Sequence, residues 1–163
     1  MELRKAARDP WVWGQTILLL VMLLAAPLLP RYVDLGAADF MLNRIDPSST
    51  RWFAAPLMLA GLALLLWGVR SLGPNLTPGV EPPAGAELVT SGAYAHTRHP
   101  IYAGAVLLLA GYTLAWSNWT LALVLGGLAL GYFSAKARAE EIHLAARFPG
   151  YGRYALQVRR RLL

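Results

Sequence analysis

Four runs of apolar residues without a charged side chain set the pattern of this chain. They cover about 11–29, 52–69, 100–116 and 118–135. A helix needs about 20 such residues to cross the roughly 30 Å hydrocarbon core of a bilayer. The last two runs are shorter and are joined only by Ser117-Asn118, which predicts a tight antiparallel helical hairpin. The pattern therefore predicts an all-α integral membrane protein with about four transmembrane helices, in a single domain that covers residues 1–163.

Tryptophan and glycine positions agree with these runs. Amphipathic aromatic rings prefer the membrane interface, and all six tryptophans fall near predicted helix ends: Trp11, Trp13, Trp52, Trp67, Trp116 and Trp119. Gly127 and Gly131 are four residues apart in the fourth run, a spacing that predicts close helix packing. We expect the same role for Gly61, Gly68 and Gly111.

Two segments are polar enough to lie outside the membrane. Residues 70–99 are rich in Gly and Pro, which predicts a structured loop before the third helix. Residues 136–163 are basic and have a helical pattern that is broken near Pro149-Gly150, which predicts a C-terminal amphipathic helical segment. The Arg159–Arg161 run in this segment is expected to be attracted to anionic lipid headgroups.

Composition supports the membrane assignment and predicts its orientation. Of the 163 residues, 56% are hydrophobic and 15% are charged, and cysteine is absent. The lack of cysteine excludes disulfides, thiolate nucleophiles and cysteine metal sites. Of the 15 Lys and Arg residues, only Arg31, Arg44 and Arg51 fall between the first two runs. Basic residues favour the cytosolic side, so we expect both termini in the cytosol, a multi-pass protein of the bacterial inner membrane, and no nucleic-acid partner.

The segment from Arg98 to Tyr102 is the first candidate for chemistry. Pro100 opens the third apolar run, and proline suits the first turn of a helix. Arg98, His99 and the free amides of that turn would gather positive potential, which binds carboxylates and other anions. Tyr102 adds a ring and a hydroxyl. The alternative is an ordinary interfacial helix start whose arginine reaches toward the membrane surface.

Acidic residues after the fourth run are the second candidate. Glu140-Glu141 could form a carboxylate pair beside the membrane, able to bind an ammonium group or a ribose diol. The alternative is a solvated helix in which Lys136 pairs with Glu140 four residues later. His96, His99 and His143 form only a weak metal signal, because Pro100 prevents a helix across the first two. We therefore expect no metal.

Together these motifs resemble the isoprenylcysteine carboxyl methyltransferase family, which is related to membrane phospholipid N-methyltransferases. The resemblance covers about residues 72–154. It begins at Leu72-Gly73-Pro74-Asn75-Leu76-Thr77, strengthens through Glu87–Gly104 with Gly92-Ala93-Tyr94 and Arg98-His99-Pro100-Ile101-Tyr102-Ala103-Gly104, and continues through Glu140-Glu141 and Phe148-Pro149-Gly150-Tyr151-Gly152-Arg153-Tyr154. The first two runs match only as hydrophobic helices.

This resemblance implies S-adenosylmethionine as the methyl donor and S-adenosylhomocysteine as the product. It implies donor contacts from Ala86, Glu87, Leu88, Val89, Tyr94, His99, Pro100, Ile101, Tyr102 and Glu140, to which the basic helix start adds Arg98. The implied acceptor is lipid-like or prenylated and is methylated at a carboxylate. Lys136 and Glu141 are the candidates to orient it. Lys136 stands where the family commonly has Arg, and a lysine cannot hold a carboxylate bidentately.

Three other functions are also compatible with the sequence. The chain could methylate a phospholipid or another amine, in which case Glu141 could take the proton. It could be an NADPH-dependent enzyme like the sterol reductases, which carry a similar Arg-His-Pro-x-Tyr stretch. It could also be a lipid-binding subunit without catalytic activity. The oligomeric state is not predicted.

Overall fold

The computed structural model of the chain describes residues 9–32, 47–116 and 119–162. Within the first two ranges, it describes the side chains of residues 9–29 and 52–116. These residues form helices and loops: α2 (Pro10–Tyr32), α4 (Pro47–Leu72), the short 3-10 helices η1 (Gly73–Asn75) and η2 (Gly92–Ala95), α5 (Pro100–Trp116), α6 (Trp119–Arg147) and α7 (Tyr151–Gln157). Three of them are long and apolar enough to cross a membrane, and α5 is a shorter apolar helix. The prediction of an all-helical membrane protein with about four such helices is confirmed. The predicted turn at Ser117-Asn118 lies outside the described residues.

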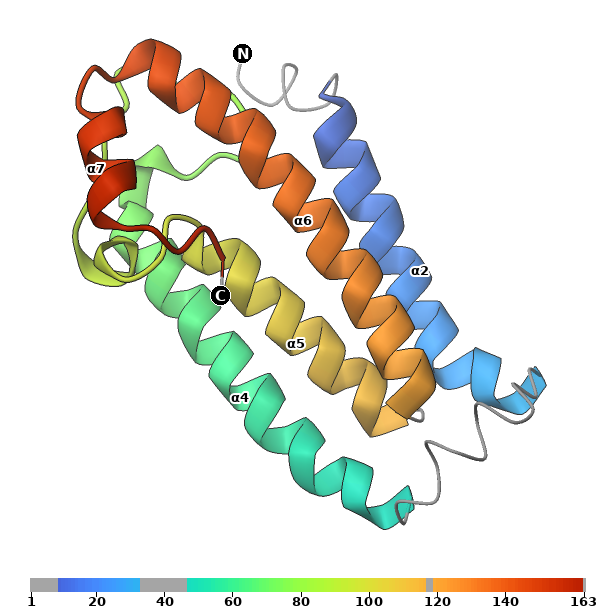
Figure 1. Cartoon of the computed structure of the whole chain (residues 1–163). Helices are drawn as coiled ribbons and strands as arrows, with labels where there is room; N and C mark the ends of the chain where they lie inside the picture. Colours follow the sequence, from blue (N-terminus) through green and yellow to red (C-terminus); the bar gives the residue numbers. More distant parts are fainter. Residues whose placement is uncertain (1–8, 33–46, 117–118, 163) are drawn as a thin grey trace.

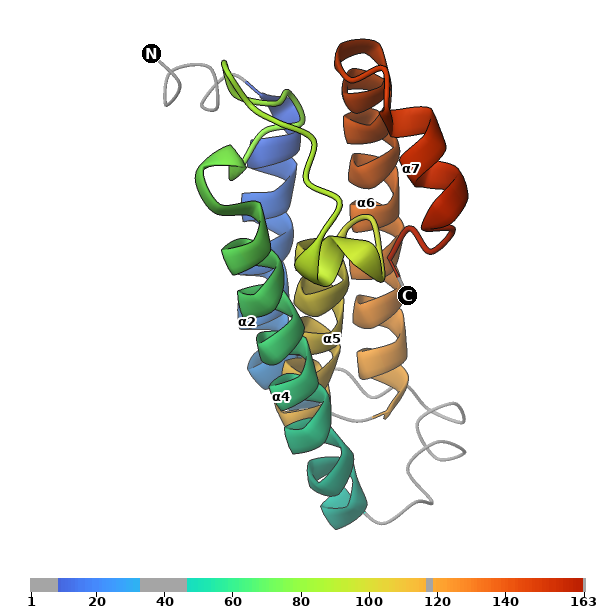
Figure 2. The same cartoon turned by 90° about the vertical axis from the view of Figure 1, so that its left-hand side faces the viewer.

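The four long helices form a bundle in which consecutive helices run in opposite directions (Figure 1). α5 packs against α4, α6 and α2, and is therefore the central helix. The start of α2, the end of α4, the start of α5 and the end of α6 consequently lie at one end of the bundle (Figures 1 and 2). The loop between α4 and α5 and the C-terminal segment both lie at this same end.

Glycines allow the close contact between α4 and α5. A Cβ atom added to Gly61 would stand 2.5 Å from the backbone nitrogen of Leu108, and one added to Gly104 would stand 2.6 Å from that of Leu65. Gly68 and Gly111 are similarly crowded by the facing helix. The packing role predicted for Gly61, Gly68 and Gly111 is thus correct.

The prediction for the fourth run is wrong. Within the described structure, a Cβ atom at Gly127 or Gly131 would have no neighbour within 4 Å. This pair does not mark a helix contact. The close glycine-mediated packing is instead between α4 and α5.

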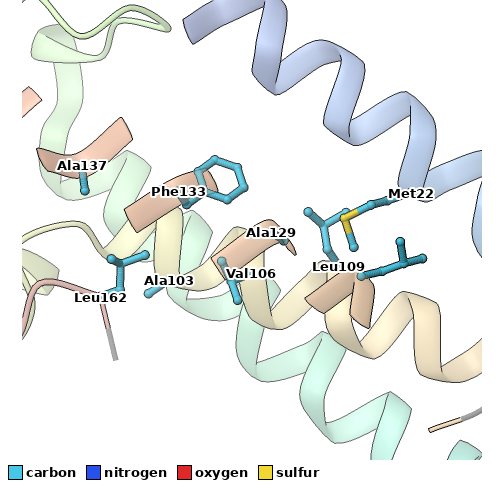
Figure 3. Close-up of a cluster of buried hydrophobic side chains, with 9 residues drawn as sticks. Met22, Ala103, Val106, Leu109, Ala129, Phe133, Ala137 and Leu162 are labelled. Atoms are coloured by element: carbon cyan, nitrogen blue, oxygen red, sulfur yellow. The ribbon is translucent and has the colours of Figure 1, made fainter. Parts of the chain in front are cut away.

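The core of the bundle lies between α2, α5 and α6 (Figure 3). Phe133 is the largest side chain in it and is 1% exposed. Met22 of α2, Val106 and Leu109 of α5, and Ala129 of α6 pack around the same region. Many large apolar side chains of α2 and α4 point outward instead, as expected where lipid replaces water around a helix.

The loop between α4 and α5 is fixed to the start of α2. The carboxylate of Asp9 accepts hydrogen bonds from the backbone amides of Trp11 at 2.8 Å and of Val80 at 3.1 Å. At the other end of the loop, Gly92 has a positive φ of 62° and stands close to Ser71, whose hydroxyl accepts the amide of Ala93 at 3.1 Å. The predicted structured loop is therefore found, held at both ends.

The C-terminal segment turns back over the bundle. α6 ends at Arg147 and α7 begins at Tyr151, so the predicted break near Pro149-Gly150 is confirmed. After α7, residues 158–162 run without regular secondary structure to the start of α5 (Figure 2). Leu162 is 7% exposed and belongs to the core cluster.

Candidate active site

His99 lies at the start of α5 between two carboxylates from α6. Its side chain is 3% exposed, with Nδ1 3.5 Å from Glu140 Oε2 and Nε2 3.3 Å from Glu141 Oε1. Burial favours the neutral ring, but the hydrogen bonds and charges of both carboxylates outweigh it and raise the pKa of His99 above its ordinary value of 6.5. The ring also stacks on Tyr102, with centroids 5.4 Å apart and planes 1° from parallel. The site therefore favours a histidine that carries a positive charge.

Glu141 is held by three cationic side chains. Arg161 Nε donates to both carboxylate oxygens at 3.0 Å, and its Nη2 lies 2.9 Å from Oε2. Arg98 Nε is 3.2 Å from Oε1, and His99 approaches the same oxygen. For Arg161 this corrects the prediction of lipid-headgroup binding, because its guanidinium is paired with a carboxylate of the protein. Arg159 and Arg160 are exposed.

Glu140 and Lys136 lie on the inner side of this cluster. The Tyr102 hydroxyl donates to Glu140 Oε2 at 2.8 Å. Lys136 is 1% exposed, and its ammonium donates to Gln15 Oε1 at 2.5 Å and to the Pro78 carbonyl at 2.8 Å. The ammonium also lies 5.3 Å from the centre of the Tyr102 ring. Lys136 is thus part of the interior, whereas a solvated Lys136–Glu140 pair would have been exposed.

Two adjoining pockets open around these residues. The first, called here the lysine pocket, has a volume of about 240 Å³, and its polar lining residues are Gln15, Thr77, Tyr94, His99, Tyr102, Lys136 and Glu140. The second, called here the loop pocket, is lined by residues 86–89, Arg98, Glu140, Phe148, Tyr151 and Tyr154, among others. Leu72, Thr77, Tyr94 and Glu140 line both pockets. A molecule in one pocket would therefore lie next to a molecule in the other.

The loop pocket contains buried polar atoms that the protein itself leaves without a hydrogen bond. Within the described structure, neither Arg98 Nε nor the Tyr151 hydroxyl makes a well-aligned hydrogen bond, although both lie near the Glu141 carboxylate. Tyr151 is 5% exposed, and burial followed by the charge of Glu141 raises its pKa, so its hydroxyl keeps its proton. Buried donors of this kind are normally satisfied. Arg98 and Tyr151, together with Glu140, suit a small molecule that carries an anionic group and also a cationic or hydroxyl group. An amino acid joined to a nucleoside is a molecule of this kind.

The predicted donor residues are brought together in these two pockets. Ala86, Glu87, Leu88, Val89 and Arg98 line the loop pocket, His99, Ile101 and Tyr102 line the lysine pocket, and Tyr94 and Glu140 line both. Pro100 lines neither of the two, and begins α5 beside Gly68. The predicted acceptor residues separate: Lys136 lines the lysine pocket, whereas Glu141 faces the arginines and lines neither pocket.

Sequence reasoning missed several residues of the site. Gln15 holds Lys136 from α2, and its only signal was a polar amide within an apolar run. Tyr151 and Tyr154 were named as parts of the Phe148–Tyr154 motif, without a role of their own. The Tyr154 hydroxyl donates to the Tyr94 carbonyl at 2.8 Å, and burial raises the pKa of Tyr154 to about 12. It therefore donates this hydrogen bond at all physiological pH values.

Among the described residues no group of three or more His, Asp or Glu side chains is arranged to hold a metal ion. No curated protein is similar enough to the chain to count as a match. A sequence model of the isoprenylcysteine carboxyl methyltransferase (ICMT) family matches residues 54–146, which is more than half of the 163 residues. Its members are membrane methyltransferases that use S-adenosylmethionine, and the match supports an enzyme of that kind. On this match, and with His99, Lys136 and Glu140 inside the matched segment, the chain belongs to the ICMT family.

Proposed function

We propose that this protein transfers a methyl group from S-adenosylmethionine to the carboxylate of a lipid-like or isoprenoid acceptor at the cytosolic face of the membrane. The observation that carries the proposal is the pair of adjoining pockets with Glu140 and Tyr94 in their common wall. One pocket is lined by Arg98, Tyr151 and Glu140, which suit a small zwitterion, and the other offers a buried ammonium at the end of apolar helices. A methyl-transfer reaction needs two neighbouring sites of these two kinds.

The loop pocket is the proposed site of the methyl donor. Arg98 and Tyr151 would bind its carboxylate, and Glu140 would accept from its ammonium or ribose hydroxyls. Residues 86–89 and the aromatic side chains Phe148 and Tyr154 would enclose the remainder. When bound, the donor would supply a methyl carbon bonded to a positively charged sulfur. The acceptor oxygen would bond to this carbon through a lone pair while the carbon–sulfur bond breaks and leaves a neutral thioether. The protein therefore contributes mainly proximity and orientation.

The lysine pocket is the proposed site of the acceptor group. The ammonium of Lys136 has three N–H donors, and Gln15 and Pro78 use two of them. The third would bind one carboxylate oxygen of the acceptor and leave the other to attack. A carboxylate carries its reactive lone pair without losing a proton, so no general base is required. A protonated amine would be repelled by Lys136, which favours O-methylation over N-methylation.

The remaining contacts assign different roles to the two glutamates. We propose that Glu140 contacts the donor, because it lines both pockets. Glu141 is directed at Arg98, His99 and Arg161, and we propose that it acts by holding these side chains. The apolar side chains of Leu72, Leu76 and Ile101 in the lysine pocket would contact the acceptor's lipid chain.

Direct binding and turnover test this function. Purified protein in lipid nanodiscs should bind S-adenosylhomocysteine in a calorimeter, and should not bind NADPH. With labelled donor it should transfer label to a small isoprenylated cysteine or to a component of a membrane lipid extract. Alkaline treatment should release the label as methanol, because an ester is cleaved and an N-methyl group is not.

Variants connect this activity to the site. Lys136→Met keeps an unbranched side chain of similar length but removes the charge, and should raise the KM for the acceptor with little change in S-adenosylhomocysteine affinity. Gly127→Ala is a suitable control, since its Cβ would meet no neighbour within 4 Å. The proposal is refuted by absence of S-adenosylhomocysteine binding, and its carboxylate assignment by a label that resists alkali.

A further inference from the structure

The last residues of the chain lie directly against the start of α5. The backbone amides of Arg98 and His99 donate to the carbonyls of Arg160 and Arg161, both at 3.0 Å. The Thr97 hydroxyl lies 3.0 Å from the Arg161 carbonyl and 2.9 Å from that of Leu162. Thr97 is 6% exposed and Leu162 is 7% exposed. This C-terminal strap, residues 158–162, therefore has anchors in its backbone and in a buried leucine that do not involve the Arg161 side chain.

The Arg161 side chain makes a different kind of contact. It is turned onto Glu141, and its Nε and Nη2 together approach both carboxylate oxygens at 2.9 to 3.0 Å. Forked contacts of this kind are stronger and better oriented than single hydrogen bonds. They occupy both oxygens of the carboxylate that lies nearest to Arg98 and His99.

Arg98 and Tyr151 line the loop pocket and lie near the carboxylate that Arg161 holds. Arg98 Nε is only 3.2 Å from Glu141 Oε1 but is not hydrogen bonded to it. The Tyr151 hydroxyl is buried, and it too lies near the Glu141 carboxylate without a well-aligned hydrogen bond. If Arg161 were absent, Glu141 would lose its strongest partner and could rotate to accept from Arg98 or Tyr151. Either contact would turn a side chain that lines the loop pocket away from a ligand.

We propose that Arg161 is a positioning residue of the methyl-donor site, which holds Glu141 so that Arg98 and Tyr151 stay available to the donor's carboxylate. This inference rests on the proposed function, because it assigns the loop pocket to the methyl donor. It extends the site beyond residues 54–146, which the family model matches, and it gives the end of the chain a role in donor affinity.

The test compares Arg161→Ala with Arg159→Ala in the full-length protein in nanodiscs. Arg159 belongs to the same basic run and is exposed. The wild type and Arg159→Ala should bind S-adenosylhomocysteine equally well. Arg161→Ala should weaken this binding about tenfold, the scale of one hydrogen bond to a charged group. Its KM for the methyl donor should rise, while the KM for the acceptor should stay within about twofold because Lys136 is untouched.

Rescue separates positioning from a general loss of structure. Arg161→Lys keeps the charge but not the fork, so its affinity should lie between those of the wild type and Arg161→Ala. Millimolar guanidinium should restore part of the affinity of Arg161→Ala, since the Arg161 side chain is 34% exposed and its position is reachable from solvent. Methylammonium should restore less. The double variant Glu141→Gln with Arg161→Ala should bind S-adenosylhomocysteine no more weakly than the single variant with the lower affinity.

Each outcome decides a separate question. If the wild type fails to bind S-adenosylhomocysteine, the proposed function falls. If the wild type binds and Arg161→Ala binds as tightly as Arg159→Ala, only the positioning role falls. The role is also overturned if Arg161→Ala raises the donor and acceptor KM values equally and neither Arg161→Lys nor guanidinium restores affinity, since this is the pattern of a damaged fold.

Discussion

The contact between Gln15 and Lys136 gives a prediction whose sign depends on the acceptor's charge. Gln15→Glu replaces a neutral amide by a carboxylate of nearly the same shape at a position 2.5 Å from the Lys136 ammonium. The new ion pair should hold Lys136 at least as firmly as the amide does, so the melting temperature should not fall. The added negative charge would, however, oppose any anion that the ammonium is meant to bind.

The size of this opposition follows from Coulomb's law. Two carboxylates about 6 Å apart at an effective dielectric constant of about 20 repel each other by about 3 kcal/mol. This corresponds to roughly a hundredfold increase in the KM for a carboxylate acceptor. The affinity for S-adenosylhomocysteine should change by less than about threefold, because Gln15 lines the lysine pocket and not the loop pocket.

Gln15→Leu is the matched comparison. It removes an acceptor from a buried ammonium without adding a charge, which should cost about 1.5–3 kcal/mol of stability. It should therefore lower the melting temperature but raise the acceptor KM much less than Gln15→Glu does. Both quantities are measured on nanodisc samples, by scanning calorimetry and by labelled methyl transfer.

The result that refutes this reasoning is specific. If Gln15→Glu leaves the acceptor KM unchanged while the protein stays folded, the Lys136 charge does not bind the acceptor. If Gln15→Glu lowers the acceptor KM, the acceptor is cationic and the enzyme methylates an amine.

Three further predictions address the donor pocket, pH and packing. Tyr151→Phe removes only the buried hydroxyl and should weaken S-adenosylhomocysteine binding about tenfold, as measured by calorimetry; unchanged affinity would exclude Tyr151 from the site. The folded-state pKa of His99 is raised, so its protonated form adds stability that is complete below pH 6.5 and is lost as pH rises through the higher folded-state value. The melting temperature should thus fall above pH 6.5 in the wild type and less in His99→Asn, and parallel curves would contradict this. Gly61→Ala places a Cβ 2.5 Å from the α5 backbone and should cost about 1–3 kcal/mol, whereas Gly127→Ala should be neutral or stabilising; equal melting temperatures would show that α4 and α5 can separate freely.

The helices and the proximity of several candidate site residues could be predicted from the sequence. Apolar runs of this length form helices in a membrane, because every backbone polar group must be hydrogen bonded within the segment. The cluster of His99, Tyr102 and Glu140 was predicted from the helix start and from the family motifs. These residues lie at the ends of predicted helices, so helices that alternate in direction already bring them to one end of the bundle (Figure 1).

The features that were predicted wrongly or missed depend on which segments contact one another in the folded protein. A spacing of four between glycines identifies a possible contact surface on a helix but not the partner helix, so Gly127 and Gly131 were misassigned while Gly61 was correct. Gln15 acts on Lys136 across 121 sequence positions, and Arg161 acts on Glu141 only because the strap turns back after α7. Neither contact has a local sequence signal, since a lone amide and a basic tail are both compatible with exposed positions.

The length of α5 has a consequence for how a lipid would meet the site. Its 17 residues span about 26 Å at about 1.5 Å per residue, which is shorter than the roughly 30 Å hydrocarbon core. With Trp116 at one interface, Pro100 at the opposite end of α5 would stop about 4 Å below the other hydrocarbon boundary. Because α2, α4 and α6 surround α5, the bilayer itself need not thin. The proposed site next to this end would thus lie in a recess at the membrane surface, so that an acceptor's carboxylate could reach it while its hydrocarbon chain stays in the lipid.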